Sequence, residues 1–244
     1  MSFLDWIKKY IKGKDVNKTR IPATNKIKSF PSKENSLLNE LWYNGSESDW
    51  DKALESYYRI LKPDQIPIED YINNINADEI ETLDEYAFYD FLYNKYFVWK
   101  YTAKNRLATT RMSLEKYIKN DELATLKSIH NRLFSTPKSN ITECLKIACE
   151  IRGLGTAGAS GLLAILFPEN FGTVDQFVVK RLQEIHHPVY NSVLNDMKPE
   201  SLRIKDGVIL IEIMKEKADE LNKKFHTDFW TPRKIDMILW AFGR

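Results

Sequence analysis

Cysteine is scarce in this chain of 244 residues, which contains only Cys144 and Cys149. Two thiols exclude a disulfide framework, a zinc site of four cysteines and an iron–sulfur cluster held by four thiolates. Long apolar runs are also missing, because no segment approaches the roughly 20 residues that a membrane-spanning helix needs. The first residues, Met1 to Lys14, have no apolar signal core, so we expect a cytoplasmic protein that does not contact a membrane.

The chain also lacks a large net charge, since 36 basic side chains nearly balance 34 acidic ones. The basic and acidic residues are nevertheless distributed unevenly along the chain. Residues 1–35 hold nine basic and three acidic side chains, whereas residues 36–100 hold five basic and fourteen acidic ones. An anionic partner is expected to meet the first segment or the C-terminal part, although ordinary solvated surfaces explain the pattern equally well.

The hydrophobic fraction of 43% is sufficient for a sizeable core, and the apolar residues recur at helical spacing. No run of alternating residues indicates a strand, so the predicted fold class is all-α. A short amphipathic helix and a basic arm are expected over residues 1–34, and a single helical domain over residues 35–244. Within that domain, a helix is expected at Asn35–Tyr43, and a second from a cap at Ser48 to an end at Pro63 and Pro67. One or two helices are expected within Ser113–Phe134. Further single helices are expected at Asp78–Ala103, Thr142–Arg152, Ala159–Phe167, Asp175–Ile185, 207–225 and Arg233–Phe242.

The most informative segment is a glycine-containing turn between two short helices, within a hairpin over residues 142–167. Gly153 and Gly155 permit positive φ angles and close backbone approach, and Leu154 between them is expected to enter the core. The small residues Thr156, Ala157 and Gly158 then leave the first amides of the second helix uncovered. Such a helix start binds phosphate well, although a hairpin that only needs a tight turn has the same sequence.

Asp175 lies twenty residues beyond Gly155, at the start of the next predicted helix. An aspartate is a preferred N-cap, so this position alone does not indicate chemistry. Together, the glycine turn, the apolar helix and the Val174–Asp175 pair resemble the helix–hairpin–helix superfamily of DNA glycosylases. The motif covers about thirty residues, and its helical context covers most of residues 80–244.

The resemblance implies a two-lobed fold in which DNA crosses the cleft between the lobes. It also implies that the hairpin from Gly153 to Gly158 holds a backbone phosphate, with a monovalent cation on the hairpin carbonyls. Asp175 would then be the catalytic carboxylate for a base flipped out of double-stranded DNA. The expected function is hydrolysis of the N-glycosidic bond of a damaged or modified base, in repair or in attack on foreign DNA. No other cofactor and no metal site are expected, and a monomer is favoured.

The sequence departs from the family at Ala157, where members that also cleave the strand carry a lysine. The resemblance therefore implies a glycosylase without Schiff-base lyase activity from the usual position. Further phosphate contacts are expected from Lys104, Arg106, Lys180 and Arg181, and pocket walls from Phe177, Trp230 and the aromatic residues between Tyr93 and Tyr101.

Three alternatives remain open from the sequence. The aromatic residues between Tyr93 and Tyr101 have the spacing of ordinary core residues, and His186–His187 is better explained as the end of a helix than as a metal site. The whole chain is also compatible with a non-catalytic helix–hairpin–helix module that binds DNA or a protein, in which Asp175 only caps its helix.

Overall fold

The computed structural model describes residues 33–243. Within this range the chain forms helices joined by turns and loops, and it forms no β-strand. The all-α prediction is confirmed for these residues, whereas the predicted helix at Met1–Lys12 and nearly all of the arm over residues 1–34 lie outside them. The helices, with one π-helical segment named η1, are α2 (Lys33–Asn44), α3 (Glu47–Arg59), α4 (Ile66–Asn73), α5 (Ala77–Glu81), α6 (Glu85–Asp90), η1 (Phe91–Tyr96), α7 (Phe97–Lys100), α8 (Lys104–Leu114), α9 (Lys116–Lys119), α10 (Leu123–Ser135), α11 (Ile141–Cys149), α12 (Thr156–Leu166), α13 (Gln176–Glu184), α14 (Asn191–Asn195), α15 (Ile204–Phe225) and α16 (Pro232–Phe242).

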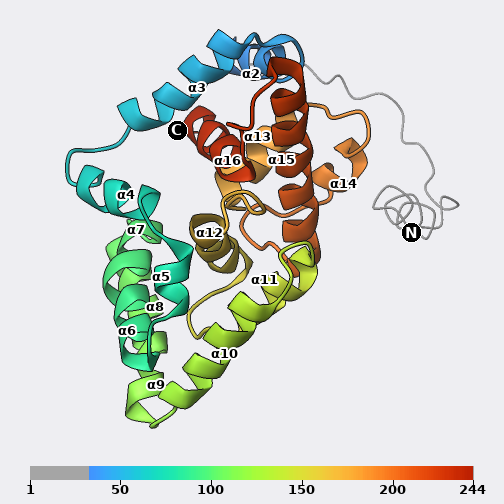
Figure 1. Cartoon of the computed structure of the whole chain (residues 1–244). Coiled ribbons are helices and arrows are strands. Elements are labelled where there is room, and N and C mark those ends of the chain that lie inside the picture. The colour runs from blue at the N-terminus through green and yellow to red at the C-terminus, as the bar shows by residue number, and fades with distance from the viewer. Residues whose placement is uncertain (1–32, 244) are drawn as a thin grey trace, which may run out of the picture.

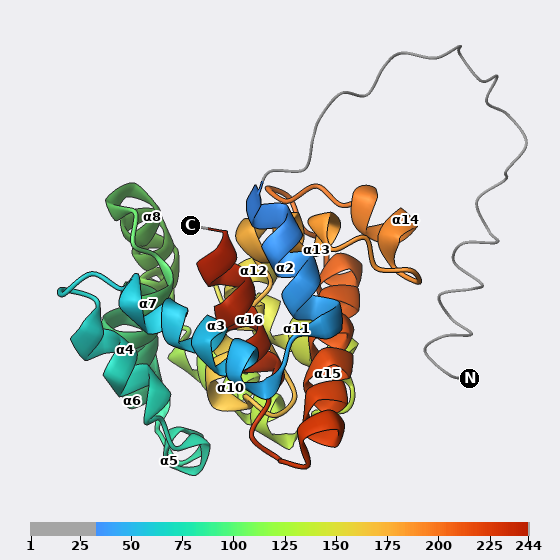
Figure 2. The ribbon, with the colours of Figure 1, turned by 90° about the horizontal axis from the view of Figure 1, so that it is seen from above.

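These helices form two groups with α12 between them (Figure 1). The α4–α9 group is one side of the molecule, and the α13–α16 group is the other. Helix α10 leaves the first group along the base of the molecule and leads to α11. Helices α2 and α3 lie over the α13–α16 group, and α3 packs on α16 (Figure 2). The first described helices therefore complete the C-terminal half, and the chain crosses between the halves after α3 and again through α10.

Helix α12 is the centre of the core. From Gly158 to Leu166 every residue is buried, as its nearly uniform apolar sequence leads one to expect. Leu162 and Leu163 are fully covered by neighbouring helices. Each buried leucine contributes about 1.5–3 kcal/mol relative to an exposed one, so α12 holds the residues around it in fixed positions.

Local capping explains where several helices begin, and it corrects one predicted boundary. Ser46, not Ser48, caps α3: its Oγ accepts the Asp49 amide at 3.3 Å, and Oδ2 of Asp49 accepts the Ser46 amide at 3.0 Å. The predicted role of Pro67 is also wrong, because Pro67 lies in the first turn of α4. A proline there loses no helical hydrogen bond, so it starts a helix instead of ending one.

The long helix predicted over Asp78–Ala103 is wrong, because the chain is broken inside it. Asp84 accepts the Ala87 amide through Oδ1 at 2.8 Å and thereby starts the new helix α6. After α6 the backbone takes the wider π-helical turn η1, in which the Phe97 amide donates to the Leu92 carbonyl five residues earlier. The aromatic spacing fits an unbroken helix, but the capping carboxylate of Asp84 divides the segment.

Candidate functional site

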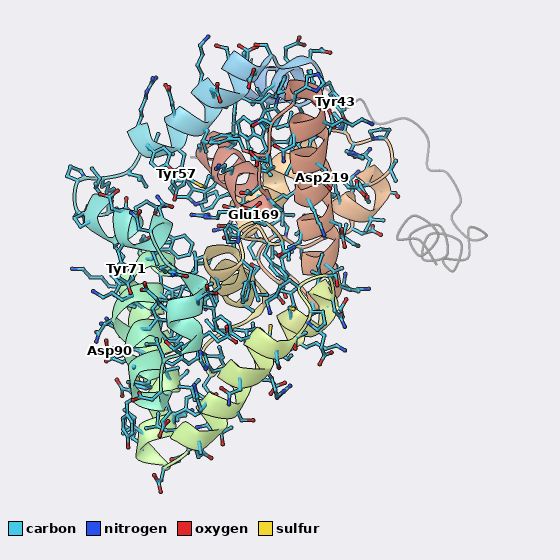
Figure 3. The ribbon with its side chains drawn as sticks, viewed as in Figure 1. Tyr43, Tyr57, Tyr71, Asp90, Glu169 and Asp219 are labelled. Atoms are coloured by element: carbon cyan, nitrogen blue, oxygen red, sulfur yellow. The ribbon has the colours of Figure 1, made fainter. Side chains whose placement is uncertain are left out.

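A pocket of about 810 Å³ opens between the two groups of helices. One wall comes from α4 and the α7–α8 connection, and the other from α3, α12, α13 and α16. Tyr57 stands in this wall beneath α3 and beside α16 (Figure 3). Aromatic side chains of the lining are Tyr57, Trp99, Tyr101, Phe177 and Trp240, and charged ones are Lys62, Asp64, Glu69, Lys100, Arg106, Asp175, Glu200, Arg233 and Asp236.

Glu69 and Arg233 form the buried base of this pocket. The Glu69 carboxylate accepts the Tyr57 hydroxyl at 2.8 Å and the Trp99 indole N–H at 2.7 Å, which joins three helices at one side chain. Arg233 on α16 reaches Glu69 at 3.5 Å and Asp236 at 2.5 Å. Because all of these partners are interior groups, they fix the distance between the two walls.

Asp236 connects the same network to the chain just before Asp175. Its Oδ2 accepts the backbone amide of Thr173 at 2.6 Å, while its Oδ1 pairs with Arg233. Burial raises the pKa of Asp236, and the neighbouring Arg233 guanidinium opposes that rise. The Val174 amide next to it donates to Ser160 Oγ at 2.9 Å, so both α12 and α16 hold the segment that leads to Asp175.

Asp175 is half-buried and lines the pocket at the start of α13. Its Oδ1 accepts the amides of Phe177 at 2.9 Å and Val178 at 3.1 Å, so the residue is the N-cap of the helix. Its other oxygen, Oδ2, has no hydrogen-bond partner among the described residues. The side chain therefore caps the helix with one oxygen and keeps the other for a ligand or a water molecule in the pocket.

The glycine turn before α12 has the backbone geometry that its sequence predicts. Gly153 has a φ angle of 95°, and a Cβ at this position would lie 2.9 Å from the Thr110 carbonyl oxygen. Leu154 is buried in the core, as expected. Gly155 is exposed, with open space where a Cβ would point, and it provides no side-chain cap for α12. The start of α12 is thus bare beside the pocket.

The three small residues after this turn have different surroundings. Ala157 is half-buried and lines the pocket. Thr156 is buried, and Gly158 is buried with its carbonyl accepting the Tyr96 hydroxyl. A Cβ on Gly158 would also collide with the Tyr101 hydroxyl. Of these three predicted phosphate-binding residues, Thr156 and Gly158 are packed against neighbouring helices, and only Ala157 lines the pocket.

The predicted basic contacts fall into two sets. Lys104 and Arg106 are exposed on α8, and Arg106 lines the pocket. Lys180 pairs with Glu200 at 3.3 Å. Arg181 is largely enclosed by Glu184 at 2.7 Å and the Phe242 carbonyl at 3.3 Å, and it is not among the pocket residues.

Of the two predicted pocket aromatics, Phe177 and Trp230, only one lies at the pocket. Phe177 lines the pocket, with its ring edge-on to Trp240 at 6.5 Å between centroids. The prediction for Trp230 is wrong. Its side chain is 2% exposed and packs edge-on against Trp50 in the core, with 5.8 Å between the ring centroids. The sequence placed it near the cap of α16, but the preceding loop turns its ring inward, where Asn222 holds its backbone through hydrogen bonds at both N–H and C=O.

Sequence reasoning missed the pocket residues Glu69 and Arg233. Their only sequence signal is a charged residue inside an apolar helical face, such as Glu69 directly after Ile68. The histidine pair behaves as expected of a helix end, because His186 has a positive φ of 52° just after α13. No group of three metal-binding side chains occurs within residues 33–243.

Comparison with models of protein families, with curated proteins and with solved structures yields no match. In the part of the chain that is described, no helix combines the length and apolar character needed to cross a membrane.

The monovalent cation implied by the resemblance stays a prediction. Near the glycine turn, the carbonyls of Glu150 and Ile151 accept the Tyr117 hydroxyl at 3.2 Å and the Leu154 amide at 3.0 Å.

Proposed function

We propose that this protein is a DNA glycosylase that hydrolyses the N-glycosidic bond of a damaged or modified base in double-stranded DNA. The proposal includes the helix–hairpin–helix identity of α11, the glycine turn and α12, with DNA crossing between the two groups of helices. The observation that carries it is the position of Asp175, whose carboxylate lines the same pocket as Ala157 in the first turn of α12.

The chemistry requires a carboxylate beside the sugar. When the bond between C1′ and the base nitrogen breaks, its electron pair leaves with the base and positive charge grows on the sugar. Oδ2 of Asp175 stabilises this charge and accepts the proton of the water molecule that adds to C1′. Oδ1 stays bound to the Phe177 and Val178 amides, which holds the acid in one orientation during the reaction.

The pocket has the size and lining that a flipped nucleotide needs. Its volume of about 810 Å³ lies within the range of roughly 300–1,000 Å³ typical of ligand sites. Phe177 and Trp99 offer apolar ring surface, and polar side chains stand nearby for the edge of a base. Because a base inside a duplex is inaccessible, the enzyme must extrude it at a cost of a few kcal/mol.

Phosphate contacts offset that cost. The bare start of α12 at Gly155 presents backbone amides and the positive end of the helix dipole. Arg106 on α8 is exposed and lines the pocket, and the exposed Lys104 precedes it by two residues. Both supply positive charge for neighbouring phosphates. None of these contacts recognises a base, so they position DNA irrespective of sequence.

One observation favours a second candidate function, a non-catalytic helix–hairpin–helix module for DNA or a protein partner. Asp175 makes both hydrogen bonds of a complete N-cap, which is a sufficient structural reason for an aspartate at this position. The two functions differ in chemistry: the module binds DNA but produces no abasic site from any duplex.

The test is a panel of duplexes that contain oxidised, alkylated, deaminated or hypermodified bases. Released base is quantified directly, and abasic sites are converted to strand breaks with alkali. We expect release from at least one duplex by the wild-type protein and none by Asp175→Asn, which keeps the same shape and DNA affinity. Equal base release by both proteins would refute the role of Asp175, and DNA binding without release from any duplex would favour the module.

A further inference from the structure

Lys100 is an unpaired lysine in the pocket wall. It is the last residue of α7, is half-buried and makes no hydrogen bond or ion pair with any described residue. Its amine lies 5.9 Å from the centre of the Trp99 ring. The buried Lys217 shows the usual arrangement, in which the amine donates to the Trp42 carbonyl at 2.9 Å and to Glu220 at 2.6 Å. Leaving a partly enclosed amine without such partners is costly, so Lys100 is unusual in this fold.

Two features of the backbone place this amine. The π-helical turn η1 inserts one residue, which rotates the following side chains by about 100° relative to a regular α-helix. On the opposite side, Gly161 of α12 makes room for the lysine stem, since a Cβ there would lie 3.2 Å from both Cδ and Cε of Lys100. The stem therefore runs across α12 at Gly161.

Gly161 is four residues after Ala157, so both lie on one face of α12. Ala157 lines the same pocket and occupies the position where the resemblance expects a lysine in strand-cleaving enzymes. Lys100 thus brings an amine from α7 to the face of α12 where the resemblance expects one. The sequence cannot show this arrangement, because residues 100 and 157 come to line one pocket only in the folded chain.

The charged groups around Lys100 come from two other elements. Burial lowers the pKa of the Lys100 amine, while the carboxylates of Asp175 and Asp236 act in the opposite direction and Arg233 adds to the lowering. A lowered pKa increases the neutral fraction of an amine near pH 8, and the neutral form is the nucleophile. Asp175, which lines the same pocket, is available to accept the proton that the ammonium group loses.

We propose that Lys100 is the nucleophile of a second reaction in this pocket, directed at the abasic sugar. This inference rests on the proposed function, which supplies the abasic site. The neutral amine adds to the C1′ aldehyde of the ring-opened deoxyribose. The proton that Asp175 accepted is returned to the hydroxyl group of this adduct, which leaves as water and gives a protonated imine. Loss of a proton from C2′ then breaks the C3′–O bond, so the 3′ phosphate departs and the strand is cleaved. Water hydrolyses the imine and restores the lysine.

This reaction reverses the expectation of a glycosylase without lyase activity, which was based on Ala157 alone. Strand breaks should appear before alkali is added. The cleavage needs no oxidant, reductant or metal, because water and the protein side chains balance every proton.

The test uses a duplex with a preformed abasic site, incubated with the full-length protein and sodium cyanoborohydride. The reductant converts the imine to a stable amine, and the covalent complex is separated by denaturing electrophoresis. We expect a trapped complex whose cross-linked peptide contains Lys100, identified by mass spectrometry of the wild-type protein. Lys100→Met should lose it, and the exposed Lys95→Met on the neighbouring η1 should retain it. Thermal melting of both variants confirms that they are folded.

Each outcome decides one of the two proposals. Absence of a trapped complex, or a cross-link at another amine, overturns the role of Lys100. If base release from the modified duplexes persists in that case, the glycosylase function stands by itself. A cross-link at Lys100 without base release from any duplex supports the amine and instead overturns the glycosylase proposal.

Discussion

The clearest prediction concerns Arg233, the cation at the base of the pocket. Arg233→Met keeps most of the aliphatic stem but removes the guanidinium that pairs with Asp236 at 2.5 Å and approaches Glu69 at 3.5 Å. Asp236 is 2% exposed and Glu69 is 3% exposed, so neither carboxylate has bulk water to replace the lost cation. The Thr173 amide, Tyr57 and Trp99 still donate to them, but none of these groups carries charge.

The expected magnitude follows from this burial. Removing one partner of a buried ion pair typically costs about 3–5 kcal/mol, because the remaining charge stays desolvated. For a chain of this length each kcal/mol lowers the melting temperature by roughly 2–4 °C, so the variant should melt about 6–20 °C below the wild type. Arg233→Met, Asp236→Asn should recover part of the loss, because asparagine still accepts the Thr173 amide and has no charge.

Arg132→Met is the matched control. Arg132 donates to both carboxylate oxygens of Glu150, at 2.7 and 2.6 Å, but the two side chains are 45% and 44% exposed. An exposed pair contributes about 0–1 kcal/mol. Urea unfolding followed by circular dichroism measures both variants. If Arg233→Met loses no more stability than Arg132→Met, the network does not hold the two walls of the pocket together.

Three further predictions test separate parts of the fold. Asp175→Ala should cost about 1 kcal/mol by thermal unfolding, whereas Asp175→Asn, which still caps α13, should cost only a few tenths; equal losses would contradict the capping geometry. Leu154→Ala should cost about 2–5 kcal/mol, and a loss below 1 kcal/mol in urea would show that the turn is not anchored in the core. Burial lowers the pKa of His130, so its neutral form is favoured in the folded state and the unfolded state binds more protons. Stability should fall as the pH drops below about 6.5, with a smaller fall in His130→Gln, and identical pH profiles would exclude this histidine.

Most helices were predictable because their signals are local. Thr231 and Pro232 start α16 as expected, and the Thr231 hydroxyl accepts the Lys234 amide at 3.3 Å. The failures were local as well: Asp84 caps a helix inside a segment whose aromatic spacing predicted continuity. Aromatic periodicity reports which face is buried, but it does not report whether the backbone continues through a capping residue.

The candidate site was predictable only in part. The sequence identified three site residues because each has a local role: Gly153 has a positive φ, Gly155 leaves a helix start uncovered, and Asp175 is an N-cap. Such roles can be inferred from the neighbouring residues in the sequence. Trp230 was assigned to the pocket wrongly because the sequence does not determine which way a loop side chain turns, and packing against Trp50 decides it.

The amino-acid sequence thus determined the helical class, the glycine turn and the acid that follows it, all of which depend on interactions within a few residues. Only the tertiary structure decided which side chains share the pocket with that acid. Lys100 and Arg233 reach it from α7 and α16, and their positions depend on the room left by Gly161 and on the contacts with Glu69 and Asp236. Such contacts join residues up to 164 positions apart, and local propensity carries no information about them.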